Sequence, residues 1–134
     1  MSDLDPPGAD HTLVRYFALL DERDVDALVA MFAPDGMMIT PGGTGGRPLV
    51  GPHALREFFV RIGPARALHQ VTRAAETGAV SLAEGVARPL EPGPPVYFLA
   101  SAQLDGDGLI TRWTSLVWPQ LTDRQERALI NGTA

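Results

Sequence analysis

The 134-residue sequence contains no cysteine and no lysine. The first absence excludes disulfides, thiolate nucleophiles and cysteine-ligated metal centres. The second excludes Schiff-base chemistry on lysine and any phosphate-binding loop that needs a lysine. All 11 basic residues are arginine, 16 residues are acidic, and the net charge is −5 with no basic stripe. We therefore expect no nucleic-acid partner.

Long apolar runs are also missing. No stretch approaches the length of a membrane span, and the acidic first ten residues lack the apolar centre of a signal peptide. The hydrophobic share of 45% and the charged share of 20% are typical of a globular domain. We expect a cytoplasmic protein with no membrane partner, with a disordered leader at 1–10, one domain at 11–121 and a tail at 122–134.

The first half of the chain has the periodicity of helices. Apolar spacing predicts a first helix within 11–24, a second from its capping residue Asp24 to Pro34, and a third within 51–63. The apolar positions are Leu13, Tyr16, Phe17, Leu20, Val25, Leu28, Val29, Phe32, Leu55, Phe58, Phe59 and Ile62. A short strand is expected at 37–40, between the second and third helices.

The second half is rich in β-formers. Four runs at 67–76, 79–90, 94–104 and 109–118 are separated by turn residues. Helices followed by consecutive strands predict an α+β fold, in which three N-terminal helices pack on one face of a mostly antiparallel sheet.

Two glycine-rich turns resemble ligand loops without meeting their requirements. The stretch "PGGTGG" at 41–46 lacks the G-x-G-x-x-G spacing. It suits a flexible loop at a pocket rim, although Arg47 and the third helix could instead hold an anion there. The stretch "DGDG" at 105–108 lacks the later calcium ligands and indicates a hairpin turn. His11, His53 and His69 show no metal-binding spacing, so we expect no metal.

Two strand residues are candidate acid–base groups. Glu84 alternates with Val80, Leu82 and Val86, which places a carboxylate on an apolar face where burial would raise its pKa. The alternatives are that this face is exposed, or that Arg73 or Arg88 neutralises the charge. His69 shares a predicted face with Val71 and Arg73, and either a catalytic or a structural hydrogen-bonding role is compatible with that position.

The order of elements, filled as "VRYFALLDERDVDALVAMFAPDG", "GPHALREFF" and "GDGLITRWTSLVW", resembles the ketosteroid isomerase-like or SnoaL-like branch of the nuclear transport factor 2-like superfamily. The resemblance spans residues 11–119. It implies a cone-shaped α+β barrel in which a strongly curved sheet surrounds an apolar pocket, and a homodimer formed through the convex face, where we place Tyr97, Leu99 and Trp118.

The resemblance also assigns positions. The tyrosine that polarises the substrate in ketosteroid isomerases corresponds to Tyr16, but the family's base falls on Thr40 and its second aspartate near Ala100. Ketosteroid isomerisation by the usual route is therefore not expected. In scytalone dehydratase-like members a strand histidine works with tyrosines, and His69 is similar in position.

We therefore expect cofactor-free acid–base catalysis on a small hydrophobic, oxygenated ligand, by cyclisation, isomerisation, dehydration or epoxide opening. The base would be Glu84, or His69 in its place, and Tyr16 would polarise or protonate the substrate oxygen. The expected substrate-binding residues are Met37, Ile39, Thr40, Phe59, Arg73, Phe98, Ala100, Trp113 and Ser115. The alternative is a non-catalytic ligand-binding or dimerisation module of the same fold.

Overall fold

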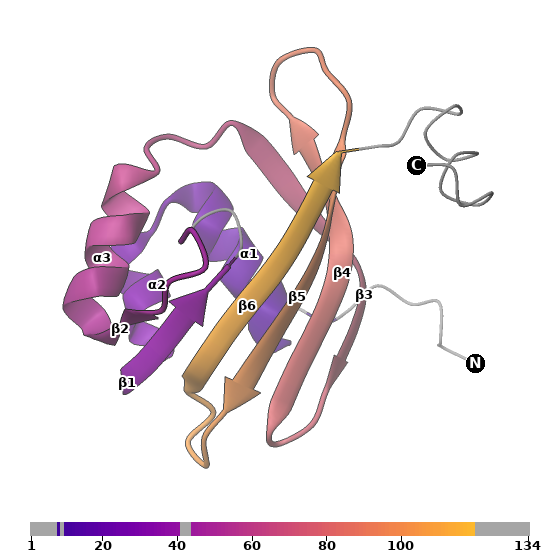
Figure 1. Cartoon of the computed structure of the whole chain (residues 1–134). Helices are drawn as coiled ribbons and strands as arrows, with labels where there is room; N and C mark the ends of the chain where they lie inside the picture. Colours follow the sequence, from indigo (N-terminus) through magenta and orange to yellow (C-terminus); the bar gives the residue numbers. More distant parts are fainter. Residues whose placement is uncertain (1–7, 9, 41–43, 120–134) are drawn as a thin grey trace, which may run out of the picture.

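A computed structural model describes residues 8, 10–40 and 44–119, with the side chains of 118 and 119 left out (Figure 1). The expected leader and tail fall almost wholly outside these residues. The elements are α1 (Thr12–Glu22), α2 (Val25–Ala30), β1 (Phe32–Ile39), β2 (Leu49–Val50), α3 (Gly51–Arg61), β3 (Ala67–Glu76), β4 (Val80–Pro89), β5 (Val96–Leu104) and β6 (Ile110–Pro119). Within the described chain, no helix is both long and apolar enough to cross a membrane.

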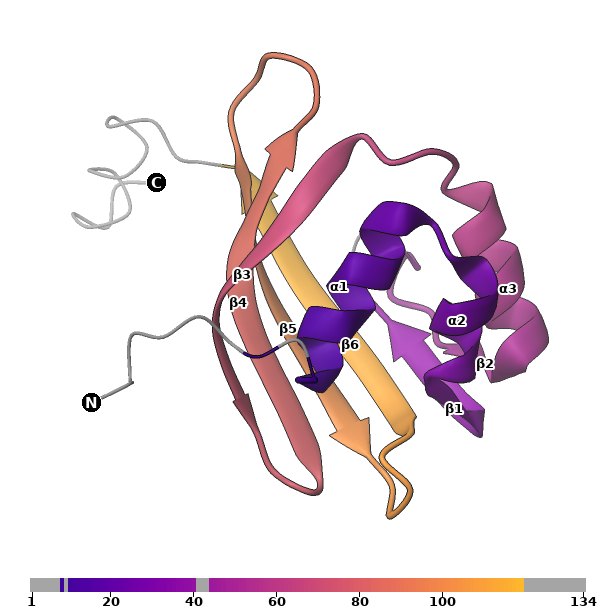
Figure 2. The same cartoon turned by 180° about the vertical axis from the view of Figure 1, so that it is seen from behind.

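The strands form one open sheet in the order β2-β1-β6-β5-β4-β3. Strands β3 to β6 run antiparallel as consecutive hairpins, whereas β1 pairs with β6 in parallel. The three helices cover one face of the sheet (Figure 2), which we call the inner face, and the opposite one the outer face. The expected α+β architecture is confirmed, although the sheet is not closed into a barrel.

Residues paired across antiparallel strands point to the same face of a sheet. The inner face therefore carries four rows from β3 towards β6. They are Glu76, Ser81, Ala102 and Trp113; Ala74, Ala83, Ala100 and Ser115; Val71, Gly85, Phe98 and Val117; and His69, Ala87 and Val96. The outer face carries Ala75, Leu82, Ser101 and Thr114; Arg73, Glu84, Leu99 and Leu116; and Gln70, Val86 and Tyr97.

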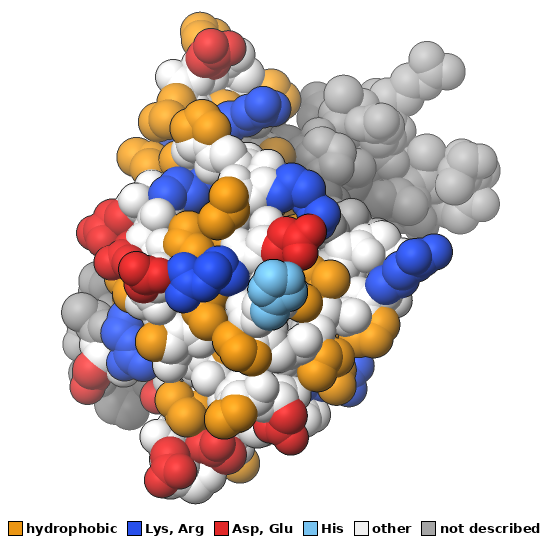
Figure 3. Space-filling model, turned by 90° about the vertical axis from the view of Figure 1, so that its left-hand side faces the viewer, with side chains coloured by type: hydrophobic (Ala, Val, Ile, Leu, Met, Phe, Trp, Pro, Cys, Tyr) orange, Lys and Arg blue, Asp and Glu red, His pale blue; other side chains and the backbone are white. Residues whose placement is uncertain are grey.

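The core lies between the inner face and the helices. Helix α1 packs on β3, β4 and β5, and α3 packs on β1. Tyr16 and Phe17 of α1 meet Trp113 and Phe98 of the sheet, with ring centroids 4.9 Å apart for Tyr16 and Trp113 and 4.5 Å for Phe17 and Phe98. The outer side of the helical layer shows Arg and Asp or Glu side chains interspersed (Figure 3), as expected for helices with one face in solvent.

The backbone N–H groups at the starts of α1 and α2 find hydrogen-bond acceptors in two different ways. Asp24 caps α2 as its position predicts, because its carboxylate accepts the Ala27 backbone N–H at 3.2 Å. His11 precedes α1 but makes no capping hydrogen bond through its side chain. Instead Glu76, at the end of β3, accepts the Thr12 backbone N–H at 2.9 Å. The start of α1 is therefore fixed by a residue 64 positions away.

One predicted boundary is wrong. Helix α2 ends at Ala30, and Phe32 begins β1 rather than closing the helix, so β1 starts five residues before the expected strand. Pro34 lies inside β1, at an irregularity where the pairing with β6 shifts between Phe32 and Met37. Such a shift accommodates a proline because the residue need not donate to the ladder.

Candidate functional site

A cavity of about 330 Å³, which we call the inner cavity, lies between helices α1 and α3 on one side and strands β1 and β6 on the other. Its lining residues are Tyr16, Leu20, Met38, Thr40, Phe58, Ile62, Trp113, Ser115, Leu116 and Val117. Leu20 and Ile62 belong to the C-terminal ends of α1 and α3, and Val117 lies near the end of β6. All three elements end at the top of the molecule in Figure 1, so the inner cavity extends from Tyr16 towards that end.

Among the described residues that line the cavity, Tyr16 is the ionisable one. Its side chain is only 1% exposed, and the ring packs against Phe17, Phe59 and Trp113. Within the described residues its hydroxyl has no hydrogen-bond partner. Burial raises the pKa of this phenol well above its ordinary value, although the positive charge of Arg23 acts in the opposite direction. The group is thus a neutral phenol at physiological pH and can donate a hydrogen bond.

Three further polar side chains line the inner cavity. Thr40 exchanges hydrogen bonds with Thr44, since each side-chain oxygen accepts the other residue's backbone N–H, at 2.9 and 3.0 Å. Thr40 therefore holds the described part of the glycine turn, while 41–43 lie outside the described residues. Ser115 carries a hydroxyl, and the buried indole Nε1 of Trp113 has no partner in the described chain.

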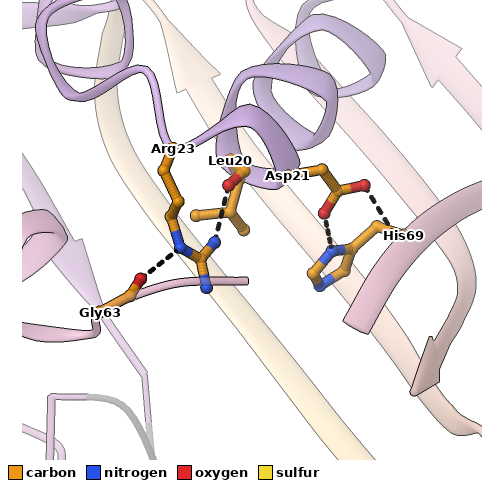
Figure 4. Close-up of polar contacts among 5 residues, drawn as sticks. All are labelled: Leu20, Asp21, Arg23, Gly63 and His69. Carbon is orange, nitrogen blue, oxygen red and sulfur yellow. Dashed lines mark hydrogen bonds and ion pairs between the residues drawn. The ribbon is translucent and has the colours of Figure 1, made fainter. Parts of the chain in front are cut away.

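His69 is held by a carboxylate that the sequence did not single out. The Nδ1 atom of His69 lies 2.6 Å from Oδ1 of Asp21, and the His69 backbone N–H donates to Oδ2 at 2.8 Å (Figure 4). The imidazole also stacks on Phe17, with centroids 5.0 Å apart, and meets the edge of Phe98 at 5.5 Å. His69 does not line the inner cavity, but the ring of Phe17 contacts both the imidazole and the ring of Tyr16.

Arg23 joins the two helix ends beside this pair. It adopts the left-handed conformation with φ of 56°, and this ends α1. Its Nε donates to the Gly63 carbonyl at 2.7 Å and its Nη1 to the Leu20 carbonyl at 2.6 Å (Figure 4). Because α1 and α3 supply Leu20 and Ile62 to the lining, Arg23 fixes the spacing of the cavity's open end.

Glu84 does not share a cavity with Tyr16, so that expectation is wrong. It lies on the outer face, where its carboxylate pairs with Arg73 at 3.0 Å and its side chain is 41% exposed. Alternation identifies the two faces of a strand but not which one is buried. Here the inner positions of β4 are the small residues Ser81, Ala83 and Gly85, against which α1 packs.

Arg73 is displaced from its predicted face by a bulge. The pairing of β3 with β4 shifts between Val71 and Arg73, so His69 and Val71 face inward and Arg73 faces outward. Arg73 is 84% exposed and does not line the inner cavity.

The remaining substrate-binding predictions have different outcomes. Thr40, Trp113 and Ser115 line the inner cavity, as predicted. Met37 and Ile39 lie on the outer side of β1, where they pair with Arg112 and Thr114 of β6. The predicted placement of Met37 and Ile39 in the pocket was therefore wrong. Met38, between them, is 1% exposed and lines the cavity instead. Phe59 and Phe98 are core residues behind the lining, and Ala100 lies on the inner face beside Ser115.

A second hollow, the outer groove, lies on the opposite side of the sheet. Its volume is about 550 Å³. Three exposed leucines, Leu82, Leu99 and Leu116, and the Arg73–Glu84 ion pair line it. Tyr97 lies beside it on the same face and is 37% exposed.

Asp21 and Arg23 were missed because no local signal marks them. Both stand in the acidic and basic stretch that ends the first predicted helix, and their partners His69 and Gly63 are 48 and 40 positions away. Among the side chains that the structure describes, no three His, Cys, Asp or Glu residues are grouped so as to hold a metal ion.

Three helices on the inner face of an open six-stranded sheet, with an apolar cavity between them, define a nuclear transport factor 2-like fold. The structure of an NTF-2-like protein of unknown function from Burkholderia xenovorans LB400 matches with a TM-score of 0.69 and 17% identity, over 88% of each chain. The epoxide hydrolase/cyclase-like enzyme SalBIII, of pyran ring formation in the polyether salinomycin, matches with a TM-score of 0.62 and 23% identity, over 84% of this chain and 90% of that chain.

A protein with a ketosteroid isomerase-like fold from Catenulispora acidiphila DSM 44928, solved with trimethylamine, matches with a TM-score of 0.66 and 18% identity, over 80% of this chain and 85% of that one. No curated protein matches the sequence. The family model of the SnoaL-like domain matches residues 13–113. The chain therefore belongs to the SnoaL-like domain family, and the resemblance noted in the sequence is confirmed.

Proposed function

We propose that this protein catalyses an acid–base reaction on a small, neutral, hydrophobic molecule that carries an oxygen atom. The observation that carries the proposal is the Tyr16 hydroxyl, which lines an apolar cavity without a hydrogen-bond partner in the described chain. Because Tyr16 forms part of the cavity wall, its hydroxyl is available to donate a hydrogen bond to a molecule in the cavity. A ligand oxygen in the inner cavity would accept it.

The lining supports a neutral ligand. Tyr16 is the one ionisable side chain among the described lining residues, and it stays protonated because burial raises its pKa. A charged ligand would lose its hydration without gaining a counter-charge, which is unfavourable in an apolar cavity. Hydroxyls from Thr40 and Ser115 add two polar contacts that a ligand with a carbonyl, hydroxyl or ether group can use.

Tyr16 and His69 have different proposed roles, because they lie at different ends of the site. Tyr16 donates a hydrogen bond to a substrate oxygen and stabilises the negative charge that develops on it. His69, one aromatic ring away and nearer the open end, removes a proton from the substrate and returns it. Cyclisation, isomerisation, dehydration and epoxide opening each use such a pair. Neither Thr40 nor Ala100 takes part in proton transfer in this scheme.

The bicyclic ketone 2-tetralone tests both roles. In D₂O a base takes a proton from the carbon next to its carbonyl, the oxygen accepts a hydrogen bond as it becomes an enolate, and a deuteron from solvent replaces the proton. We expect the protein to accelerate this exchange, followed by ¹H NMR. The variants Tyr16→Phe and His69→Gln should each lower the rate by about a hundredfold, the lower end of what one acid or base contributes.

The matched control is His53→Gln, because the side chain of His53 is 98% exposed on α3. This variant should exchange 2-tetralone at the wild-type rate. Equal rates for wild type and His69→Gln would show that His69 is not the base. Saturable quenching of tryptophan fluorescence by 2-tetralone, with exchange no faster than in buffer, would instead identify a binding protein and overturn the enzymatic proposal.

A second candidate function, a homodimeric module, is favoured by the outer groove. Leu82, Leu99 and Leu116 are 47%, 43% and 53% exposed on one face, and contiguous apolar surface of this kind marks interaction sites. A second copy related by two-fold symmetry would place each copy's leucines against the other's. Sedimentation equilibrium at micromolar concentration tests this. Leu99→Glu should yield a monomer, while Val60→Glu, at an exposed position on α3, should not change the mass; a monomeric wild type would contradict the dimer.

A further inference from the structure

Arg23 adopts a backbone conformation that its residue type disfavours. Among the described residues, it is the one residue other than glycine with a positive φ, which is 56°. Glycine takes this left-handed conformation without strain and is the usual residue at the end of a helix. Strained residues that are retained cluster at binding sites and active sites. We therefore expect the arginine side chain to have a role that glycine could not fill.

The guanidinium of Arg23 bridges two helices whose backbones do not approach each other closely. Among the described elements, α2 packs on both α1 and α3, but the backbones of α1 and α3 are not in contact. Deep in the core, the rings of Tyr16 and Phe59 join these helices, with centroids 6.4 Å apart. At the open end of the inner cavity, Arg23 donates to the Leu20 carbonyl of α1 and to the Gly63 carbonyl just beyond α3 (Figure 4). Hydrogen bonds from a charged donor are roughly twice as strong as neutral ones.

The inner cavity lies between the aromatic contact and the Arg23 bridge. Leu20 and Ile62 line it, and each belongs to one side of the bridge, because Leu20 supplies one acceptor and Ile62 directly precedes Gly63. The cavity volume of about 330 Å³ is near the lower end of the range for ligand pockets, about 300–1,000 Å³. A ligand longer than the cavity would have to extend between Leu20 and Ile62, where the bridge holds the helix ends together.

We propose that Arg23 limits the size of the ligand, because it holds α1 and α3 together across the open end of the inner cavity. Arg23 is thus a positioning residue, which acts on ligand choice through Leu20 and Ile62. This inference rests on the proposed function and adds to it the size class of the ligand, a compact molecule such as a bicyclic ketone. Arg23→Gly keeps the left-handed backbone, loses both side-chain hydrogen bonds and should admit longer ligands.

Two ketones of different length test the proposal by binding alone. They are 2-tetralone and tetrahydrophenanthren-2-one, which has the same ketone ring and one more fused benzene ring. Binding quenches the fluorescence of Trp113, which lines the cavity, and a Trp118→Phe background leaves it as the one tryptophan. We expect this background to bind 2-tetralone about tenfold more tightly than the longer ketone. Adding Arg23→Gly should abolish this preference, through tighter binding of the longer ketone.

Arg23→Asn provides a second variant with the same expected result, because asparagine tolerates the left-handed backbone and is too short to bridge the helices. The matched control is Arg61→Gln, which removes a positive charge from the exposed last turn of α3 and leaves the bridge in place. It should keep the tenfold preference.

Two results would overturn the proposal. One is an unchanged preference in both Arg23 variants together with a lower melting temperature, since Arg23 would then only fasten α1 to α3. The other is that neither ketone binds to any of these proteins. If the preference changes as expected but the wild type does not exchange 2-tetralone, the proposed catalysis fails while the role of Arg23 stands.

Discussion

Replacing Tyr16 by phenylalanine separates the function of the hydroxyl from the packing of the ring. The ring is fully enclosed by Phe17, Phe59 and Trp113, and phenylalanine preserves these contacts. The hydroxyl contributes no hydrogen bond within the described chain. We therefore expect Tyr16→Phe to fold normally, to lose catalysis and to gain stability.

The magnitude follows from the cost of an unsatisfied polar group, about 1–3 kcal/mol when it is buried. The Tyr16 hydroxyl lies at a cavity wall, so we expect the lower end, a gain of about 1 kcal/mol. For a chain of 134 residues this raises the melting temperature by about 4 °C. Tyr16→Leu, which also removes the ring, should instead cost about 3 kcal/mol or more.

Urea unfolding followed by circular dichroism gives both free energies, and the exchange of 2-tetralone gives the activity. The expected pattern is a phenylalanine variant that is more stable and about a hundredfold slower. A loss of more than about 1 kcal/mol in Tyr16→Phe would refute the reasoning, because the hydroxyl would then have a partner that stabilises the fold. Full activity in that variant would refute the assignment of Tyr16 as the donor.

Further predictions concern the sheet and the start of α1. Gly85→Ala should lower the free energy of unfolding by about 3 kcal/mol in urea. The reason is that the new Cβ would lie 2.1 Å from the Gln70 carbonyl oxygen and 2.6 Å from the Phe98 ring. Gly78→Ala is the control, because a Cβ there has nothing within 4 Å, and it should change the free energy of unfolding by less than about 0.5 kcal/mol. Glu84→Gln should change stability by less than about 0.5 kcal/mol and leave the exchange of 2-tetralone unchanged, because its ion pair is exposed; a loss of activity would contradict the placement of Glu84 outside the site. Burial raises the pKa of Glu76, but hydrogen bonds from Thr12 and Ser81 and the charge of His11 outweigh it and hold the pKa below the ordinary 4.5. The contribution of Glu76 to the free energy of unfolding should therefore be fully present above pH 4.5 and should be lost as the pH falls below it. In Glu76→Gln the free energy of unfolding should depend less on pH in this range. An equal slope in both proteins would contradict the contribution of Glu76.

The candidate site was only partly predictable. Tyr16, Thr40, Trp113 and Ser115 were expected in the pocket and do line the inner cavity. Glu84 was misplaced because an apolar alternation does not say which face the helices will cover. Met37 and Ile39 were misplaced in the same way, since Met38 between them faces inward. The predicted face of Arg73 was wrong because β3 has a bulge between Val71 and Arg73, and no residue type in the sequence indicates that bulge.

The sequence by itself determined the elements and the class of fold. Helical spacing placed α1 and α3 to within two residues, β-rich runs placed β3 to β6, and Asp24 marked the start of α2, because these features depend on neighbouring residues. Tertiary structure alone decided which sheet face became the interior, which carboxylate fixes the start of α1, and which one holds His69. Glu76 and Asp21 meet their partners across 64 and 48 residues, and contacts between such distant positions are set by how α1 packs on the sheet.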